Sequence, residues 1–457
     1  MLRLGRDNCP AVDPISFRQR TAWALLVASI LTSLCAPDSY AQRSLFGSVD
    51  DPEEQSNVAW WESYSEFQTA GGFSLIGPQW RTAGLLEWSS YRTNTSFRLS
   101  STFRAGLYGA YEPDSDELYD LLRVVEFARY RPARGGAYVR IGPLDRARLG
   151  NGYLVNFLST EASWDERTLG LEARFEGRYV ALETISADIS RAGLIGARLS
   201  LSPFRKNSSN LHALTLGVSM MQDRDVTLDN GDRFRGVEFD VRYVAFNNGG
   251  FDFIPFASFG QLKGFGQGIL IGADLENDNF IDLARVHMRL ALQYNSSDFL
   301  PGYFGSFYGV SNMQSRILEN QNGPPVDVAL RDVQRGKSVN TELRVLVFER
   351  FEFWYAFMRY HGVQKLSEYH LRLFFRTPRF TLAVGQDRRG LKGLLSLLGE
   401  LGEENRMRFE FAYRVFSSFW VQFDAHYTYL RVTDTGDSKG YSIQRRFDPL
   451  MGLRVRF

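Results

Sequence analysis

Charged side chains recur at every second position along many segments of this chain, and these residues could bind a solute or move a proton. The segment RMRFEFAYRV, 406–415, alternates charged residues with Met, Phe, Tyr and Val. Arginine dominates the charged faces, and a guanidinium binds carboxylate or phosphate through two parallel hydrogen bonds. The set on these faces comprises Glu172, Arg174, Glu176, Glu238, Asp240, Arg242, Arg285, His287, Arg289, Glu342, Arg344, Arg372, Arg376, Arg406, Arg408, Glu410, Arg414, Asp424, His426, Arg454 and Arg456.

Two interpretations of this set remain open. The arginines could select anions or acidic sugars, or Arg and Glu on neighbouring strands could pair and simply solvate a wall. The chain carries 53 Lys and Arg against 52 Asp and Glu, and this balance favours unselective pairing. It also argues against a nucleic-acid partner, which would need a basic excess.

The residue pattern gives little support for catalysis. Asp424 and His426 share one face and form the only acid–base pair that spacing places together, without a partnered nucleophile. The five histidines, at 212, 287, 361, 370 and 426, form no cluster with metal-ligand spacing. No glycine-rich loop follows a strand and opens a helix. We therefore expect no enzyme, no cofactor and no metal site.

The elements that carry the charged faces are predicted to be β-strands. Period-two alternation of apolar and polar residues, as in 168–177, 236–243, 284–294, 369–376 and 419–430, is typical of strands with one apolar face. A soluble sandwich would bury the apolar faces against one another. However, the segments are longer than the usual ~5–6 residues, run without a helical domain from about residue 82 onward, and end in aromatic residues. These features predict an all-β transmembrane antiparallel barrel of 16–20 strands, with 18 as the best single value.

The first residues carry an export signal in their pattern. Arg18 and Arg20 precede an apolar run at 21–36, and small residues at 39 and 41 suit cleavage after Ala41. The alternative is a retained membrane anchor, which needs ~20 apolar residues, and the run at 21–36 is shorter than that. We expect a signal peptide at 1–41, which contains both cysteines, an N-terminal extension or small plug at 42–80, and the barrel at 81–457. For the stretch 59–72 a first strand is a third alternative.

The alternation predicts twenty candidate strands, of which some could merge or be false: 82–91, 94–110, 119–131, 136–144, 167–176, 178–187, 192–203, 211–222, 234–246, 251–260, 265–274, 280–294, 302–311, 338–349, 351–361, 365–376, 378–387, 405–415, 418–431 and 443–457. Counting back from the C-terminus makes 432–442, 388–404 and 312–337 outer loops, and 416–418 and 349–350 inner turns. The same count makes the long segment 223–233 an inner loop and the short segment 247–250 an outer turn. Barrels have the opposite arrangement, with short inner turns and long outer loops. We therefore expect one wrong strand in that region.

Three irregular segments could act on the barrel interior or mouth. The stretch 138–164 contains Gly142, Pro143, Gly150 and Gly152, which imply bends. It either folds inward and narrows the pore or forms a surface loop, and whether 312–337 enters the lumen is equally open. Residues 389–404 have helical spacing and form either a short helix or an ordered loop.

The last residues, MGLRVRF, place Met451, Leu453, Val455 and Phe457 on one parity. Apolar residues at every second position back from a final Phe resemble the terminal insertion signal of Gram-negative outer-membrane barrels, and length and layout resemble porins and, more loosely, polysaccharide-export barrels. The resemblance implies outer-membrane lipid and the barrel assembly machinery as partners. Porins are often homotrimers, although no pattern here is specific for a trimer. The implied function is passive diffusion of small hydrophilic solutes. The alternatives are handling of an acidic glycan, or a non-conducting receptor or structural barrel.

Overall fold

The computed structural model describes residues 65–457, except 93, 108, 133–135, 205–213, 228–232, 249, 281–282, 310–329, 331–332, 349, 362–366, 378, 391–404 and 434–438. The expected signal peptide with its cysteines lies outside the described residues. So do most of 312–337 and all but the start of 389–404.

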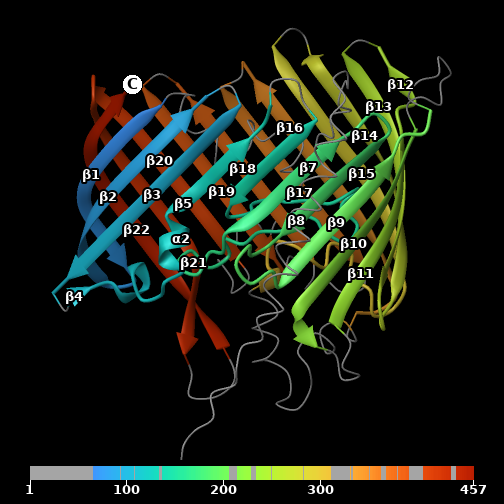
Figure 1. The fold of residues 1–457 in the computed structure, drawn as a ribbon, viewed down its shortest axis with the longest axis horizontal. Helices are drawn as coiled ribbons and strands as arrows, with labels where there is room; N and C mark the ends of the chain where they lie inside the picture. The colour runs from blue at the N-terminus through green and yellow to red at the C-terminus, as the bar shows by residue number, and fades with distance from the viewer. Residues whose placement is uncertain are drawn as a thin grey trace, which may run out of the picture.

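The described chain is built almost entirely of strands (Figure 1). Its elements are β1 (Glu66–Ile76), β2 (Gln79–Tyr91), β3 (Thr95–Gly106), β4 (Gly109–Ala110), η1 (Glu112–Asp114), α2 (Asp120–Arg123), β5 (Val125–Tyr130), β6 (Ala137–Gly142), β7 (Gly170–Glu176), β8 (Val180–Ser186), β9 (Leu194–Leu201), β10 (Leu214–Thr227), β11 (Arg233–Tyr243), β12 (Phe246–Asn247), β13 (Phe251–Leu262), β14 (Gln267–Phe280), β15 (Ala284–Asn295), β16 (Gly336–Val347), β17 (Phe351–His361), β18 (Glu368–Arg376), β19 (Phe380–Arg389), β20 (Asn405–Phe416), β21 (Phe419–Thr433) and β22 (Lys439–Arg456).

The strands close into a barrel. Each long strand pairs antiparallel with the next one along the chain, and β22 pairs with β1 from Glu66↔Arg456 to Ile76↔Arg446. In the part of the chain that the structure describes, 20 strands form the wall, and the two-residue strands β4 and β12 add to β3 and β13. The prediction of an all-β antiparallel barrel is confirmed. The count lies at the upper end of the expected range and above the best value of 18.

The barrel begins earlier than expected. Strand β1 lies inside the 42–80 region, so the first barrel residue is Glu66 rather than residue 81. Of the three alternatives for 59–72, the first strand is correct for its second part, which lies in β1. The run Ala70–Gly71–Gly72 carries no apolar periodicity, which is why alternation did not reveal this strand. Burial along β1 nevertheless alternates, because the backbone still presents successive residues to opposite faces.

The prediction of a strand at 302–311 is wrong. Tyr303, Phe304, Phe307 and Tyr308 are all buried, so the segment has no apolar and polar face to separate. Without this strand, the direction assigned to every strand before it is reversed, so the inner and outer ends of those strands exchange. Strand β10 then ends, and β11 begins, at the barrel end away from the C-terminus, while β11 ends and β13 begins at the same end as the C-terminus. The expected error therefore came from a false strand further along the chain.

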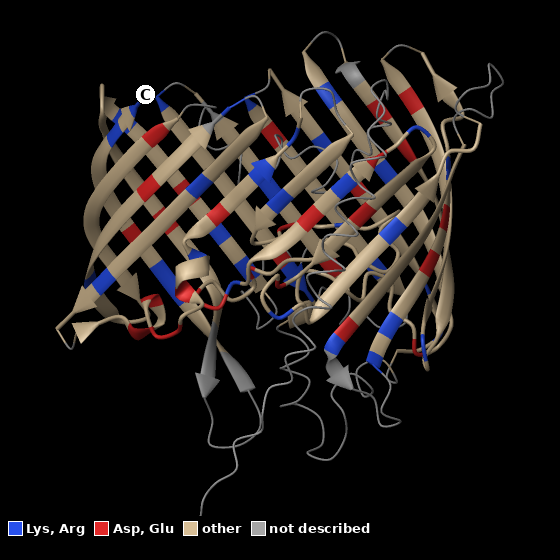
Figure 2. Ribbon diagram, in the orientation of Figure 1, with Lys and Arg blue, Asp and Glu red and all other residues tan. Residues whose placement is uncertain are grey.

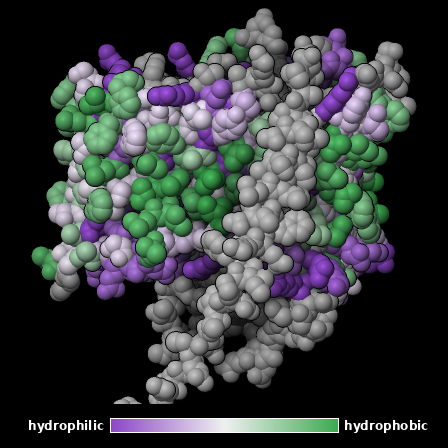
Figure 3. Space-filling view, in the orientation of Figure 1, coloured by the Kyte–Doolittle hydropathy of each residue, from purple (hydrophilic) through white to green (hydrophobic). Residues whose placement is uncertain are grey.

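The two faces of the wall have opposite character. On β22, Met451, Leu453 and Val455 are more than half exposed, whereas Leu450, just before them, and Arg454, between the last two, are buried. Exposed apolar residues form a band around the visible wall, between more polar margins (Figure 3). Charged residues are scattered along the strands (Figure 2). An apolar exterior around a closed antiparallel wall is the architecture of a membrane-spanning β-barrel.

Part of the interior is filled by the chain itself. Residues 143–169, between β6 and β7, fold into the barrel and are called the inward loop below. Leu144, Leu154 and Leu158 from this loop are almost completely buried. They pack in one apolar cluster with Phe299 and Phe304, which follow β15, and with wall residues of β8 to β17. Of the two interpretations of 138–164, inward folding is correct.

Candidate functional site

The inward loop is bound to one side of the barrel by its backbone and by charged groups. Gly302 and Phe304 donate backbone hydrogen bonds to the carbonyls of Tyr153 and Leu154, at 2.8 and 3.1 Å. Arg148 donates to Glu342 of β16 at 2.7 Å, and Arg289 of β15 donates to the Asn151 carbonyl at 3.2 Å. Because these contacts reach several strands of one side, the loop closes that side of the lumen.

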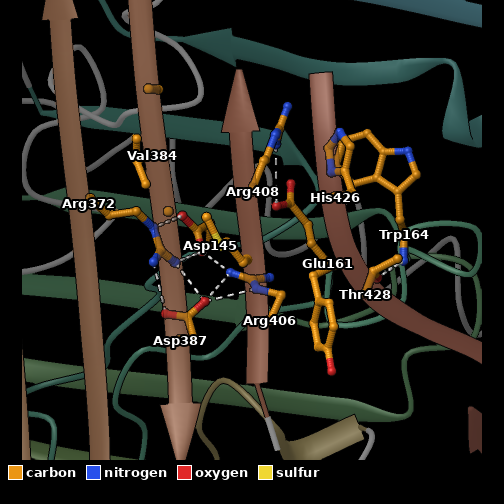
Figure 4. Close-up of a pocket in the computed structure, with 14 residues that line it drawn as sticks. Asp145, Glu161, Trp164, Arg372, Val384, Asp387, Arg406, Arg408, His426 and Thr428 are labelled. Carbon is orange, nitrogen blue, oxygen red and sulfur yellow. Dashed lines mark hydrogen bonds and ion pairs between the residues drawn. The ribbon is translucent and has the colours of Figure 1, made fainter. Parts of the chain in front are cut away.

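An ionic cluster fixes the start of the loop to β18, β19 and β20 (Figure 4). The Asp145 carboxylate accepts hydrogen bonds from Arg372 and Arg406, both at 2.9 Å. Asp387 shares the same two arginines, at 2.9 and 2.6 Å. Burial opposes ionisation of Asp145, but the guanidinium groups of Arg372 and Arg406 outweigh it and hold its pKa below the ordinary value. The loop therefore carries a charged anchor.

The second half of the loop presents Glu161 and Trp164 toward β20 and β21 (Figure 4). Trp164 packs against His426, with ring centroids 4.3 Å apart, and the Arg408 guanidinium lies 4.6 Å from its ring centroid. Its backbone N–H donates to Thr428 at 2.9 Å. Burial raises the pKa of Glu161, although Arg408 at 3.9 Å opposes the shift. Trp164 thus contacts the wall through both its ring and its backbone.

Two adjoining cavities lie beside these residues. The smaller holds about 520 Å³ of space between the loop and β18 to β21, and the larger about 1070 Å³, part of each open to solvent. Trp164, Arg408 and His426 line both. The larger cavity lies along β2, β3 and β20 to β22, on the side that the apolar cluster leaves open. It is the candidate solute pathway.

Charged side chains dominate the larger cavity. Among the described residues that line it are eight carboxylates and six arginines: Glu87, Asp114, Asp120, Glu126, Asp165, Glu410, Asp424 and Asp448, with Arg98, Arg104, Arg123, Arg167, Arg408 and Arg446.

Each of these arginines has a carboxylate beside it. Arg98 pairs with Glu87 at 2.7 Å, and Arg446 with Asp165 at 2.7 Å. Arg104 bridges Asp114 and Asp448, at 2.7 and 2.9 Å. Arg123 pairs with Asp120, Arg167 with Glu126 at 3.5 Å, and Arg408 with Glu410. The wall of the cavity is therefore mostly made of neutralised pairs.

The residues expected to line the pore divide into two groups. Arg408, Glu410, Asp424 and His426 line the larger cavity, and Arg372 and Arg406 line the smaller one. The others are not among the described residues that line either cavity. Of these, Glu238, Arg289 and Glu342 bond the inward loop.

The remaining residues of that set are placed as follows: Asp240, Arg242, His287, Arg344, Arg454 and Glu172 are buried, Arg174, Glu176, Arg285 and Arg414 are half-buried, Arg456 pairs with Glu66 at the barrel end, and the side chain of Arg376 lies outside the described part.

Asp424 and His426 each contact other groups. His426 packs on Trp164, as described above, while Asp424 accepts a hydrogen bond from Gln422 at 2.7 Å. Both side chains lie on the cavity wall as their shared parity requires. Among the described residues around them, no nucleophile, base and orienting group are arranged together.

Several cavity residues were missed from sequence. Arg446 and Asp448 share parity with Arg454 on β22, so extending the alternation backward could have revealed both. Arg98 and Arg104 lie on β3, where Ser and Thr occupy both faces and weaken the pattern. Trp164 and Asp165 belong to the inward loop, and no periodicity predicts which loop side chains reach a wall.

In the part of the chain described here, no helix is long and apolar enough to cross a membrane. The described residues also contain no group of three or more His, Cys, Asp or Glu side chains that could hold a metal ion.

Comparison with known proteins gives matches among solved structures. No family model and no curated protein matches the chain. Among solved structures it is similar to Pseudomonas aeruginosa OccK10 (OpdN), with a TM-score of 0.34 and 10% identity over 87% of this chain and 100% of that one. Pseudomonas aeruginosa OccK2 (OpdF) in complex with glucuronate gives 0.33 and 9%, over 86% and 96%. CdiB from Acinetobacter baumannii gives 0.26 and 8%, over 86% and 60%. Likeness at this level carries no argument about substrate or mechanism.

Proposed function

We propose that this protein is an outer-membrane channel through which small hydrophilic solutes diffuse passively. The observation that carries the proposal is the charged cavity of about 1070 Å³ inside a closed wall with an apolar exterior. A wall this polar is costly to place against lipid or a dry core, so its charged lining suits water and hydrated solutes.

Export and assembly complete the proposal. Residues 1–41 direct the chain out of the cytoplasm and are cleaved. The C-terminal strand, with Met451, Leu453, Val455 and Phe457 on its exposed side, is read by the barrel assembly machinery. The pairing of β22 with β1 supports this, because the terminal strand closes the wall and must be complete before lipid can surround it.

The deciding experiment is a conductance measurement on the refolded protein in a planar bilayer. Discrete current steps are expected, because the cavity offers a hydrated route on one side of the inward loop. If the inserted barrel passes no ions and liposomes that contain it take up no small sugars, the channel proposal fails. A non-conducting receptor or a barrel that handles surface glycan then takes its place.

A further inference from the structure

We infer that the barrel wall has a lateral opening beside β3, through which the head group of an amphiphile reaches the larger cavity from the bilayer. The amphiphile has an apolar chain and a polar head without net charge. This route is additional to the proposed passage of hydrophilic solutes along the barrel. It follows from a gap in the strand pairing, which the segment 111–124 covers without completing the sheet.

The wall is low on one side of β3. Strands β2 and β3 have 13 and 12 residues, whereas β5 to β9 have only six to eight. A strand that crosses the hydrocarbon core at the usual tilt needs about 9–11 residues. Strand β5 begins opposite Leu99, while β3 continues to Gly106, away from the C-terminus. Other segments must therefore face lipid beside the second half of β3.

The gap in the pairing lies along the edge of β3. This strand pairs with β5 only as far as Leu99, and with β4 from Ala105 onward. In between, the Ser100 N–H donates to the Val124 carbonyl at 2.7 Å. Among the described residues, the next backbone bond on this side is accepted by the Arg104 carbonyl, about 13 Å further along the strand. An open strand edge is not stable against lipid, so another segment must cover this one.

The helix α2, which lies at the end of β5, provides the cover (Figure 1). The Tyr119 hydroxyl, just before α2, accepts a hydrogen bond from the Leu169 N–H at 2.8 Å and donates to Asp188 at 3.1 Å. Arg123 donates to the Arg167 carbonyl at 3.3 Å, and Arg167 donates to the Arg123 carbonyl at 2.9 Å. These bonds hold α2 on the side away from β3. The seam between α2 and β3 is thus the part of the wall that can separate.

The seam joins an apolar surface to a polar cavity. Outside, Leu118 and Leu121 are 84% and 70% exposed, and Phe103 of β3 is 59% exposed. On a membrane-spanning wall, such side chains lie against lipid chains. Inside, residues 100–102 of the uncovered edge line the larger cavity. A molecule at the seam therefore keeps an apolar chain in the bilayer while its head contacts hydroxyl groups and water.

The charged groups beside the seam are already paired. Arg104 bonds Asp114 at 2.7 Å, and Arg123 bonds Asp120. A neighbouring arginine and carboxylate attract little net charge, because their fields largely cancel at a distance. The hydroxyls at 100–102 add donors and acceptors that carry no charge. The head group that fits is therefore polar without net charge.

The test is photolabelling of the barrel in lipid vesicles by a lysophosphatidylcholine that carries a diazirine in its choline group. Adducts are expected on 100–104 and 113–126. Phosphocholine with the same diazirine, which has no chain, should give none at equal concentration in water. Head-group adducts confined to the strand ends, or equal adducts from both probes, overturn the inference. Labelling requires no current, so this outcome is separate from that of the conductance measurement.

Two substitutions at the seam should change the labelling in opposite directions. Tyr119→Phe removes the hydroxyl that holds α2 and should increase the labelling by about two- to tenfold, the effect of a lost hydrogen bond on an equilibrium. Ser101→Trp, with the outward parity of Phe103, should cover the seam and abolish the cavity adducts. The matched control Thr82→Trp also faces outward, on β2 where strands pair on both sides, and should leave the labelling unchanged. Unchanged labelling in both seam variants overturns the inference.

Discussion

Asp145 offers the sharpest test of how the lumen is narrowed. Asp145→Asn keeps the shape of the side chain but removes the charge that holds the inward loop to Arg372 and Arg406. Removing one partner of a buried pair costs about 3–5 kcal/mol. Asp387 still neutralises part of the two guanidinium charges, so the expected loss is near the lower limit, about 3 kcal/mol. The measurement is urea-induced unfolding of the barrel in lipid vesicles.

The pH dependence gives this prediction a second readout. The folded pKa of Asp145 lies below its ordinary value, so its contribution is complete above the unfolded pKa of about 3.9. It is lost only as the pH falls below that value, through the folded pKa. The difference between wild type and Asp145→Asn should therefore be the same at about pH 7 and about pH 5, and should shrink in stronger acid.

Asp116→Asn is the matched control, since Asp116 is exposed on the connection between η1 and α2 and should change stability by less than ~0.5 kcal/mol. An Asp145→Asn loss below ~1 kcal/mol would refute the reasoning. So would a difference that already disappears at about pH 5, because the carboxylate would then not be held ionised by the two arginines.

Three further substitutions test other parts of the structure. Phe457→Asp places a charge on the exposed side of the terminal strand and should sharply reduce the yield of heat-modifiable, membrane-inserted barrel. The control Arg456→Gln should not reduce this yield. Wild-type yield from Phe457→Asp would contradict the role of this strand in insertion. Gly150→Ala should lower the free energy of unfolding by at least about 1–2 kcal/mol, because Gly150 has φ +61° and a Cβ would lie 3.1 Å from Ser219 Oγ. Gly250→Ala, with open space around it, is the control. Equal stabilities of the two variants would argue against this loop conformation. Trp164→Ala should increase single-channel conductance, because loss of the ring joins the two cavities. The control Trp80→Ala, on the exposed outer face, should leave the conductance unchanged. Unchanged current in Trp164→Ala would mean that ions do not pass this ring.

Local pattern was sufficient wherever a residue's role depends on its own strand. The alternation at 236–243 or 406–415 determines which side chains face lipid and which face inward, because successive residues of a strand point to opposite faces. The same reasoning identified an antiparallel barrel and placed Arg408, Glu410 and Asp424 on its inner face. It failed at β1, where Ala70, Gly71 and Gly72 carry no apolar signal, and at 302–311, where neighbouring aromatic residues are buried together.

The tertiary structure decided what the inner face can do. Whether 138–164 folds inward depends on contacts between segments far apart in the chain, such as Asp145 with Arg406 and Tyr153 with Gly302. Those contacts bury one set of arginines beneath the loop and leave another beside a cavity. Charge balance along the sequence is a sum over all residues, whereas selectivity depends on the few charges that reach the solute and on the partners they already have. For that reason the near-neutral composition of the chain does not reveal which charges line the larger cavity, where the described residues include eight carboxylates and six arginines.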